Sequence, residues 1–401
     1  MRITNIKIDG FKNLNIDMKV TPTVNILVGE NANGKTNIIE AVWLATGCRS
    51  FRNLKDKDIV DFDKDRATVE ITYTTREREN KILYVVEKNN PKDKKVYFNG
   101  VKKRSLSQLF GKLRCIVFTP DDLELSKGGP ENRRTFIDIC VSQLKPVYIM
   151  HLNKYNDALS QRNTLLKELQ MGRGDASLID IYDEQLAEHG TNISVMREEY
   201  SNLLRECAKR VFFDMSRGHE YMSLNYHSTV FDDLKYPKAD ELKEIYKQKL
   251  LSVRDEDMRM GFTTTGIHRD DIIMEVNDMN LREYGSQGQL RSVALSLKLA
   301  QAEILSKLTG EAPIILFDDA LSEIDKRRQI YVMNEIADMQ VMLTCCDPIV
   351  ALDARIGNLY AIQRGEVIEF IDNLKKMRVK PYGCVIDNLD VSKVRKLDEN
   401  K

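Results

Sequence analysis

The feature that most constrains the fold is a glycine-rich segment that directly follows a short apolar run. The apolar run is Val24–Val28, and a helix is predicted over 37–45. The segment between them has a glycine, four residues, then glycine, lysine and threonine: Gly29, Glu30, Asn31, Ala32, Asn33, Gly34, Lys35 and Thr36. Such glycines let successive backbone N–H groups and the N-terminus of the next helix face a phosphate. This order predicts an α/β fold built around a phosphate-binding loop.

We expect the loop to bind ATP with the residues from Gly29 to Asn37. Lys35 would neutralise the β and γ oxygens, and Thr36 would ligate Mg²⁺. A chance glycine turn is the alternative, but it leaves the flanking strand and helix unexplained. The loop alone indicates a bound nucleoside triphosphate and leaves the function open.

A second apolar run, Pro313–Phe317, ends in Asp318 and Asp319. A carboxylate at the C-terminal end of a strand beside a phosphate loop holds Mg²⁺ in such folds, so Asp318 is the predicted metal residue. Asp319 takes the place where ATP-binding cassette (ABC) ATPases usually carry the glutamate that polarises the attacking water, and it is the predicted catalytic base. Its side chain is one methylene shorter, so we hypothesise slow hydrolysis.

A third motif precedes the predicted helix 292–308 and consists of Ser286, Gln287, Gly288 and Gln289. It resembles the ABC signature, and its serine with the free N–H groups of the helix start would form a second anion site. In ABC ATPases the two motifs lie on opposite flanks of the sheet, so one chain cannot wrap one γ-phosphate from both sides. The resemblance implies a homodimer with two sandwiched ATP molecules, in which Ser286 acts on the partner's nucleotide. A serine N-cap that opens an ordinary helix is a compatible alternative.

The stretch Ala320–Asp325 directly follows the two aspartates and takes the place of the ABC D-loop, which lines the dimer interface. Ser322 and Asp325 also suit the N-cap of the next helix. The two interpretations are compatible.

Alternating and apolar runs predict strands over much of the rest of the chain. They cover 2–8, 24–28, 67–73, 81–87, 95–98, 271–276, 313–317, 340–344, 359–363 and 366–370. Asn99-Gly100 follows the run 95–98 and favours a type I′ hairpin turn. An antiparallel β subdomain beside the nucleotide site is therefore expected.

Helical periodicity covers 147–213 and is broken at 171–175, which predicts an antiparallel helical hairpin. The apolar stripe of its second helix runs Tyr182, Leu186, Ile193, Met196, Tyr200, Leu203 and Cys207. His189 interrupts the stripe and is interpreted as a packed histidine, because no second ligand stands four residues away. At about 1.5 Å per residue the hairpin is far shorter than the arms of SMC proteins.

The 401 residues are enough for two lobes with proper cores. We assign 1–120 and 260–370 to an ABC-type ATPase lobe, 121–259 to an inserted helical lobe, and 371–401 to a basic C-terminal tail. The seven scattered cysteines indicate reduced thiols, and no run reaches the length of a membrane span, so a cytoplasmic protein is expected. Net charge is zero, so any DNA contact must use local basic patches.

Further stretches resemble the RecF family in particular. They are Gly47–Arg52, Val117–Leu123, Gly129–Asp138, Tyr155 with Gln161–Asn163, Asp183–Ala187 and Thr265–Asp271. Together with the ATPase motifs they cover most of residues 1–370 in the family's order. The resemblance implies a DNA replication and repair protein and recombination mediator: a slow, DNA-stimulated ATPase that dimerises around ATP and Mg²⁺. It further implies binding to single- and double-stranded DNA at gapped junctions, recombinase loading with RecO and RecR, and a part in the SOS response.

The stretch Thr344–Asp347 departs from the family, where this run is more often hydroxyl-rich. Several basic residues have no role assigned from sequence: Arg49, Arg52, His268 and Arg269. Lys102, Lys103 and Arg104 could contact DNA backbone or form a solvated charge run.

Two functions of other classes remain open. A kinase with a phosphate loop would transfer the phosphoryl group to an acceptor, but it gives residues 286–289 no role. The ATPase subunit of a transporter would keep its membrane segments on another chain. The RecF-like stretches favour the DNA-binding ATPase over both.

Overall fold

The computed structural model describes residues 1–52, 58–232, 234, 239–346 and 357–371, and the predicted basic tail beyond 371 and Asp347 lie outside them. The chain divides into two compact units: Met1–Asp121 with the residues from Leu305 onward, and Asp122–Ile304. The first boundary lies next to the one predicted at 120. Residues 260–304, predicted to belong to the ATPase lobe, lie instead in the second unit.

The core of the first unit is a six-stranded sheet in the order β15-β14-β3-β13-β12-β8. Its strands are β3 (Val24–Val28), β8 (Cys115–Phe118), β12 (Ile314–Phe317), β13 (Val341–Cys345), β14 (Asn358–Gln363) and β15 (Glu366–Ile371). The pairs from β14 to β8 are parallel, and β15 is antiparallel to β14. The strands β3, β8, β12 and β13 are buried along their whole length, which explains their continuous apolar runs.

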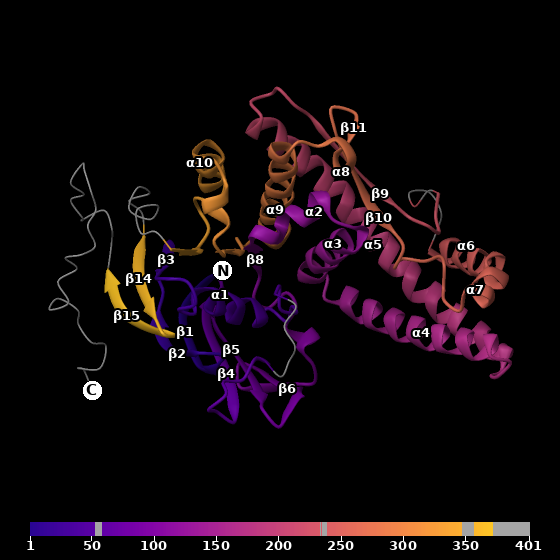
Figure 1. The fold of residues 1–401 in the computed structure, drawn as a ribbon, viewed down its shortest axis with the longest axis horizontal. Helices are drawn as coiled ribbons and strands as arrows, with labels where there is room; N and C mark the ends of the chain where they lie inside the picture. Colours follow the sequence, from indigo (N-terminus) through magenta and orange to yellow (C-terminus); the bar gives the residue numbers. More distant parts are fainter. Residues whose placement is uncertain (53–57, 233, 235–238, 347–356, 372–401) are drawn as a thin grey trace. The chain divides into compact units, whose positions relative to one another are not determined.

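A second sheet of the first unit is antiparallel, in the order β2-β1-β4-β5-β6-β7 (Figure 1). It contains β1 (Arg2–Phe11), β2 (Leu14–Lys19), β4 (Arg66–Thr74), β5 (Glu79–Glu87), β6 (Asn90–Phe98) and β7 (Val101–Lys103). The predicted hairpin turn is confirmed: Asn99 and Gly100 have φ of 50° and 78°, and Phe98 pairs with Val101. Buried and half-buried residues alternate along β4 after the exposed Arg66, as expected for a sheet with one face on a core.

Within the described residues, the helices that lie wholly in the first unit are α1 (Lys35–Leu44) and α10 (Lys326–Glu335). Short 3₁₀ turns lie at Leu106–Leu109 and Ala320–Glu323, and another, Pro120–Asp122, lies at the boundary between the units. The predicted helix after the glycine loop is confirmed, although it begins at Lys35 rather than at residue 37. Asp325 is the N-cap of α10, since its carboxylate accepts a hydrogen bond of 3.1 Å from the Arg328 N–H.

The second unit is mainly helical. Its helices are α2 (Leu123–Lys127), α3 (Pro130–Leu144), α4 (Val147–Gln170), α5 (Ile179–Met215), α6 (Ala239–Ser252), α7 (Arg254–Met260), α8 (Leu281–Tyr284) and α9 (Gln287–Thr309), the last of which runs past Ile304. A small antiparallel sheet joins β9 (Met222–His227), β10 (Asp271–Val276) and β11 (Met279–Asn280), in the order β11-β10-β9. No described helix is long and apolar enough to cross a lipid bilayer.

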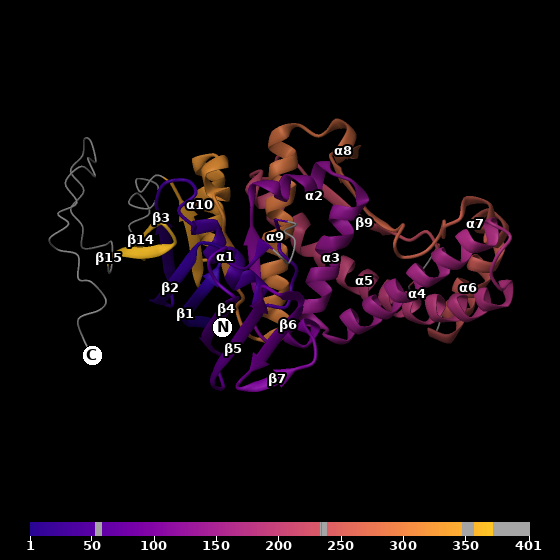
Figure 2. The ribbon, with the colours of Figure 1, turned by 60° about the horizontal axis from the view of Figure 1, so that its bottom comes forward.

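The helical hairpin predicted between 147 and 213 is confirmed by α4 and α5, which lie side by side in both views (Figures 1 and 2). The Nδ1 atoms of His151 and His189 lie 3.2 Å apart across it, so His189 is packed and its partner comes from α4. The prediction that Leu203 belongs to the apolar stripe is wrong, because Leu203 is 43% exposed and Leu204 is buried in its place. Over a helix of 37 residues the apolar face drifts relative to a strict heptad.

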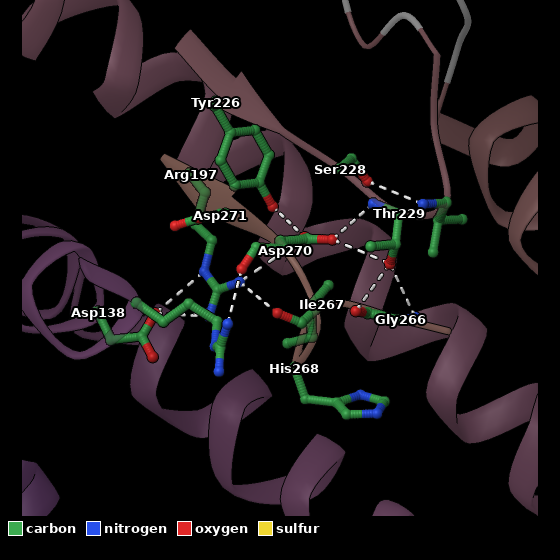
Figure 3. A network of polar contacts seen from close by, with 12 residues as sticks. Asp138, Arg197, Tyr226, Ser228, Thr229, Gly266, Ile267, His268, Asp270 and Asp271 are labelled. Atoms are coloured by element: carbon green, nitrogen blue, oxygen red, sulfur yellow. Dashed lines mark hydrogen bonds and ion pairs between the residues drawn. The ribbon is translucent and has the colours of Figure 1, made fainter. Parts of the chain in front are cut away.

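A network of buried polar groups joins the elements of the second unit (Figure 3). Arg197 of α5 donates to Asp138 of α3 at 2.8 Å and to the carbonyl of Ile267 at 2.8 Å. Asp270 accepts a hydrogen bond from the Thr229 N–H at 2.8 Å and another from the Tyr226 hydroxyl. A buried charge needs such partners, because an unpaired one costs several kilocalories per mole, of order 3–5 kcal/mol.

This network and the pairing of β10 with β9 explain why residues 260–304 belong to the second unit. Their strand and their loop make contacts with α3, α5 and β9 that the local apolar pattern does not reveal. A boundary drawn from strand-like sequence near residue 264 therefore falls inside a compact unit.

Candidate nucleotide-binding site

The glycine-rich loop connects β3 to α1 in the conformation that its glycines require. Gly34 has φ of 99°, and a Cβ atom there would lie 2.8 Å from the Leu14 side chain. A Cβ atom on Gly29 would lie 2.3 Å from the carbonyl oxygen of Ile362 on β14. Both positions therefore require glycine, because neither has room for a Cβ atom and Gly34 also has a left-handed backbone.

The ammonium of Lys35 is held over this loop. It donates to the carbonyls of Gly29 at 2.7 Å and Glu30 at 2.9 Å, and the side chain is buried. These bonds fix the lysine at the start of α1, where the helix dipole and the free N–H groups also favour an anion. The loop thus presents one positive charge and a helix N-terminus at the same place.

Three oxygen-bearing side chains meet at the carboxyl ends of β12 and β13. The Thr36 hydroxyl donates to Asp318 Oδ1 at 2.7 Å, and the Thr344 hydroxyl donates to the same oxygen at 3.1 Å. Burial raises the pKa of Asp318, and the hydrogen bonds from Thr36 and then Thr344 oppose that rise. A hydroxyl beside a carboxylate is a ligand set that suits Mg²⁺, so these residues fit the ion.

The sheet order explains how Thr344 enters the site. The strand β13 lies between β3, which leads into the loop, and β12, which leads into Asp318. The end of β13 therefore falls between the loop and the two aspartates. At this position the Thr344 hydroxyl bonds both aspartates, because in addition to donating to Asp318 it accepts a hydrogen bond of 2.9 Å from the Asp319 N–H.

Asp319, the predicted base, has a left-handed backbone with φ of 52° and a half-buried side chain. Aspartate and asparagine adopt this region several-fold more readily than other residues with a Cβ atom. The backbone therefore favours aspartate over the longer glutamate that ABC ATPases usually carry here.

A polar cluster behind the loop was not found from sequence. Asn37 donates to Asn13 at 2.7 Å and accepts from Lys12 at 3.1 Å and from Arg52 at 3.3 Å. Lys12 also pairs with buried Glu40, and burial lowers its pKa against the opposing effect of that carboxylate. The residues of this polar cluster come from the β1–β2 turn, α1 and the segment after α1, so no local sequence pattern reveals the cluster.

The structure also places the remaining residues near the loop. Burial raises the pKa of Asp318, and the nearby charge of Arg52 opposes this rise, whereas the Arg49 carbonyl accepts a hydrogen bond of 2.8 Å from Trp43 Nε1. Cys346 contacts the loop, with its sulfur 2.9 Å from Asn31 Oδ1 and 3.7 Å from Lys35 Nζ. Of the adjacent Cys345 and Cys346, the second thus lies against the phosphate loop.

The turn between β14 and β15 supports the loop from the other side. Asn33 accepts from the Arg364 N–H at 3.2 Å through its side chain and from the Gly365 N–H at 3.0 Å through its carbonyl. The loop is thus bonded to a strand pair more than 300 residues away in sequence.

The signature-like residues lie in the second unit, at the start of α9. The Ser286 Oγ accepts from the Gln289 N–H at 3.2 Å, and Gln289 Oε1 accepts from the Ser286 N–H at 2.8 Å. This reciprocal pair is a capping box. Ser286 and Gln287 are exposed, and Gly288 and Gln289 are half-buried. Because Ser286 Oγ is an acceptor here, its hydroxyl hydrogen can be donated to an anion.

The two residues of the loop 264–270 without an assigned role, His268 and Arg269, both contact aromatic side chains of this unit. His268 Nδ1 lies 2.9 Å from the Tyr155 hydroxyl, and burial lowers its pKa to about 4. The Arg269 guanidinium lies 5.3 Å from the centre of the Phe262 ring. In the first unit, Lys103 similarly covers the ring of Phe98, at 5.7 Å.

Comparison with known proteins agrees with this geometry. Residues 2–363 match the family described as RecF/RecN/SMC N terminal domain. A curated DNA replication and repair protein RecF from Halothermothrix orenii is 38% identical over 350 residues, which is 86% of this chain and 92% of that protein. A solved structure of the recombination mediator protein RecF-ATPrS in the RecFOR pathway has a TM-score of 0.84 and 32% identity, covering 91% of this chain and 97% of that one. A second, of RecF-ATP, has a TM-score of 0.83 and 30% identity over 92% and 97%.

Proposed function

Because the chain belongs to the RecF/RecN/SMC family, and within it to the RecF DNA replication and repair proteins, we propose that it works as an ATP-dependent dimer on DNA. As a RecF protein it is a recombination mediator that binds and hydrolyses ATP. This membership sets aside the kinase and the transporter subunit. The proposal concerns how the ATP site is assembled and what the assembly holds.

In the proposed site the triphosphate lies on the loop from Gly29 to Thr36, with Lys35 against its β and γ oxygens. Thr36 and Asp318 would hold Mg²⁺, which would neutralise phosphate charge. Asp319 orients and deprotonates the attacking water. Thr344 keeps both aspartates in place, because its hydroxyl bonds the side chain of one and the backbone of the next.

The observation that supports a shared site is the geometry of residues 286–289, which we call the signature turn. Ser286 and Gln287 are exposed, and the internal hydrogen bonds of the turn between Ser286 and Gln289 are already made. Such a turn can receive a phosphate without rearrangement. We propose that it binds the γ-phosphate of ATP held by a second copy, with Gly288 admitting the close approach and Gln287 and Gln289 flanking it.

The proposed partners follow the family. We propose slow hydrolysis that DNA stimulates, binding to single- and double-stranded DNA at gapped junctions, and joint action with RecO and RecR. The formal net charge of zero supports local basic contacts rather than a general attraction to DNA. ATP would close the dimer on DNA, and hydrolysis would release it.

Replacing Ser286 by arginine tests the shared site. A long cation at the turn would obstruct the partner's nucleotide while the phosphate loop stays intact. Sedimentation with a non-hydrolysable ATP analogue should show a monomer that still binds nucleotide. Ser160→Arg, at an exposed position of α4, is the matched control and should dimerise like the wild type. An ATP-dependent dimer of Ser286→Arg would rule the shared site out.

A further inference from the structure

The side chain of Gln289 makes a second hydrogen bond, outside the capping box. Its Nε2 atom donates to Glu220 Oε1 at 2.6 Å, while its Oε1 atom accepts from the Ser286 N–H. Glu220 lies 69 residues earlier, in the turn between α5 and β9. The signature turn is thus tied to a distant carboxylate of the same unit.

The chemistry of the two groups makes this bond directional. The amide of glutamine has nearly the same shape when its oxygen and nitrogen are exchanged, so its orientation depends on its partners. A carboxylate accepts hydrogen bonds and does not donate them when ionised. Glu220 therefore selects the orientation in which the NH₂ group faces it and the oxygen faces the Ser286 N–H. The exchanged orientation would bring two N–H donors together at Ser286.

Glu220 is itself held in place by the scaffold. Its N–H donates to the Ser216 hydroxyl at 3.2 Å, and that hydroxyl donates to the Glu220 carbonyl at 3.1 Å. The next residue, Tyr221, accepts from the Asn277 N–H at 3.0 Å and donates to its side chain at 3.2 Å. The backbone that carries this carboxylate is therefore fixed between the end of α5 and the turn that joins β10 to β11.

We propose that Glu220 is a positioning residue for the signature turn, which it keeps in the form that binds the partner's ATP. It orients Gln289, Gln289 holds the Ser286 backbone, and Ser286 Oγ keeps its hydroxyl hydrogen for the phosphate. The inference rests on the proposed role of the turn in a second copy's site. It adds that the turn alone is not sufficient and that the end of α5 controls its geometry.

A residue that merely stabilises the fold would behave differently from a positioning residue. Loss of a structural bond lowers the melting temperature and leaves the dimer unchanged once the chain is folded. Loss of orientation weakens the dimer and leaves the phosphate loop unchanged. Ala, Gln and wild-type side chains at position 220 separate these cases, since glutamine retains an acceptor oxygen without the charge.

The experiment measures ATP-driven dimerisation of full-length chains by sedimentation, with nucleotide affinity from a fluorescent ATP analogue and the melting temperature recorded for each. We expect Glu220→Ala to bind the analogue like the wild type and to need about threefold more protein to dimerise, because only part of the loss of this one hydrogen bond reaches the turn. Glu220→Gln should recover part of this loss. Glu206→Ala, at an exposed glutamate of α5, should match the wild type.

Each outcome of this experiment either supports or refutes the role proposed for Glu220. If wild type and Glu220→Ala dimerise at the same concentration, the inference is wrong and the shared site stands. If the wild type stays monomeric with the analogue, the shared site fails and the inference with it. If Glu220→Ala melts so low that it cannot be measured, Glu220→Gln decides: a weaker dimer at unchanged nucleotide affinity supports positioning, and a wild-type dimer refutes it.

Discussion

The phosphate loop and the signature turn both place a helix N-terminus where an anion can bind, but they are built in opposite ways. Lys35 is 4% exposed and Asp318 is 8% exposed, and the loop is bonded to strands from distant parts of the chain. Ser286 is exposed, and its turn is held by residues within four positions and by Glu220.

The difference in burial indicates that the phosphate loop and the signature turn have different tasks. A buried, cross-linked loop can bind the charged nucleotide within one chain, because its lysine and hydroxyl groups are fixed before the ligand arrives. An exposed, locally satisfied turn suits a contact made when another molecule comes close. Mutations in the phosphate loop should therefore weaken nucleotide binding, whereas mutations in the signature turn should weaken dimerisation.

The largest expected effect is at Lys35. Lys35→Met removes the ammonium that we propose faces the phosphates, and with two charge-assisted hydrogen bonds lost the affinity for ATP should fall by about 10³-fold. A titration with a fluorescent ATP analogue measures it. Lys7→Met, at an exposed position of β1, is the control and should bind normally. Normal binding by Lys35→Met would refute the role given to the loop.

The interior of the second unit should respond to acid through His268. Its folded pKa of about 4 lies below the ordinary 6.5, so the unfolded chain takes up a proton first as the pH falls. Stability should drop between pH 6.5 and 4, by on the order of 3 kcal/mol in all. Urea unfolding at several pH values should show a flatter dependence for His268→Gln than for the wild type. The exposed His219→Gln should keep the full dependence, and equal slopes in both variants would contradict the prediction.

A smaller effect is expected at Thr344. Thr344→Val removes the hydroxyl that bonds the Asp318 carboxylate and the Asp319 N–H, and the loss of these two hydrogen bonds costs about 1–3 kcal/mol. Turnover of ATP should fall about tenfold while binding changes little. Thr344→Ser keeps the hydroxyl and should retain turnover. Equal rates in the two variants would show that the hydroxyl does not position the aspartates.

A smaller effect still is expected for Ser286→Ala. It removes the helix cap and the donor to phosphate, at a cost of about 1 kcal/mol, or roughly fivefold in the dimer constant. Binding of the ATP analogue by the monomer should be unchanged, in contrast to Lys35→Met. Sedimentation over a concentration series measures the dimer constant, and a weaker monomer affinity for ATP would break the division of roles.

Much of the fold could be predicted because its signals are local. The buried strand Val24–Val28 and the strand Asp271–Val276 have the predicted bounds, and the Asn-Gly turn lies where its backbone preference places it. The residues of the loop and of the capping box are also local in sequence. Neighbouring residues suffice to specify such features, since turn chemistry and apolar periodicity act over a few positions.

The rest depends on contacts between distant segments. The placement of β13 between β3 and β12, which brings Thr344 to the aspartates, follows from sheet order and has no local signal. The partner of Lys12 is Glu40, and the partner of Gln289 is Glu220, each a single charged residue among many. The wrong boundary at residue 260 has the same cause, because the buried Arg197 network joins segments that look independent in sequence.

A mixing experiment tests the shared site most directly. Lys35→Met and Ser286→Arg are each expected to hydrolyse almost no ATP alone. In a mixed dimer, the intact loop of one chain meets the intact signature turn of the other, so one of two sites works. With random pairing of equal amounts, the mixture should recover up to about one quarter of wild-type activity. A mixture no more active than the sum of its separate components would show that each chain completes its own site.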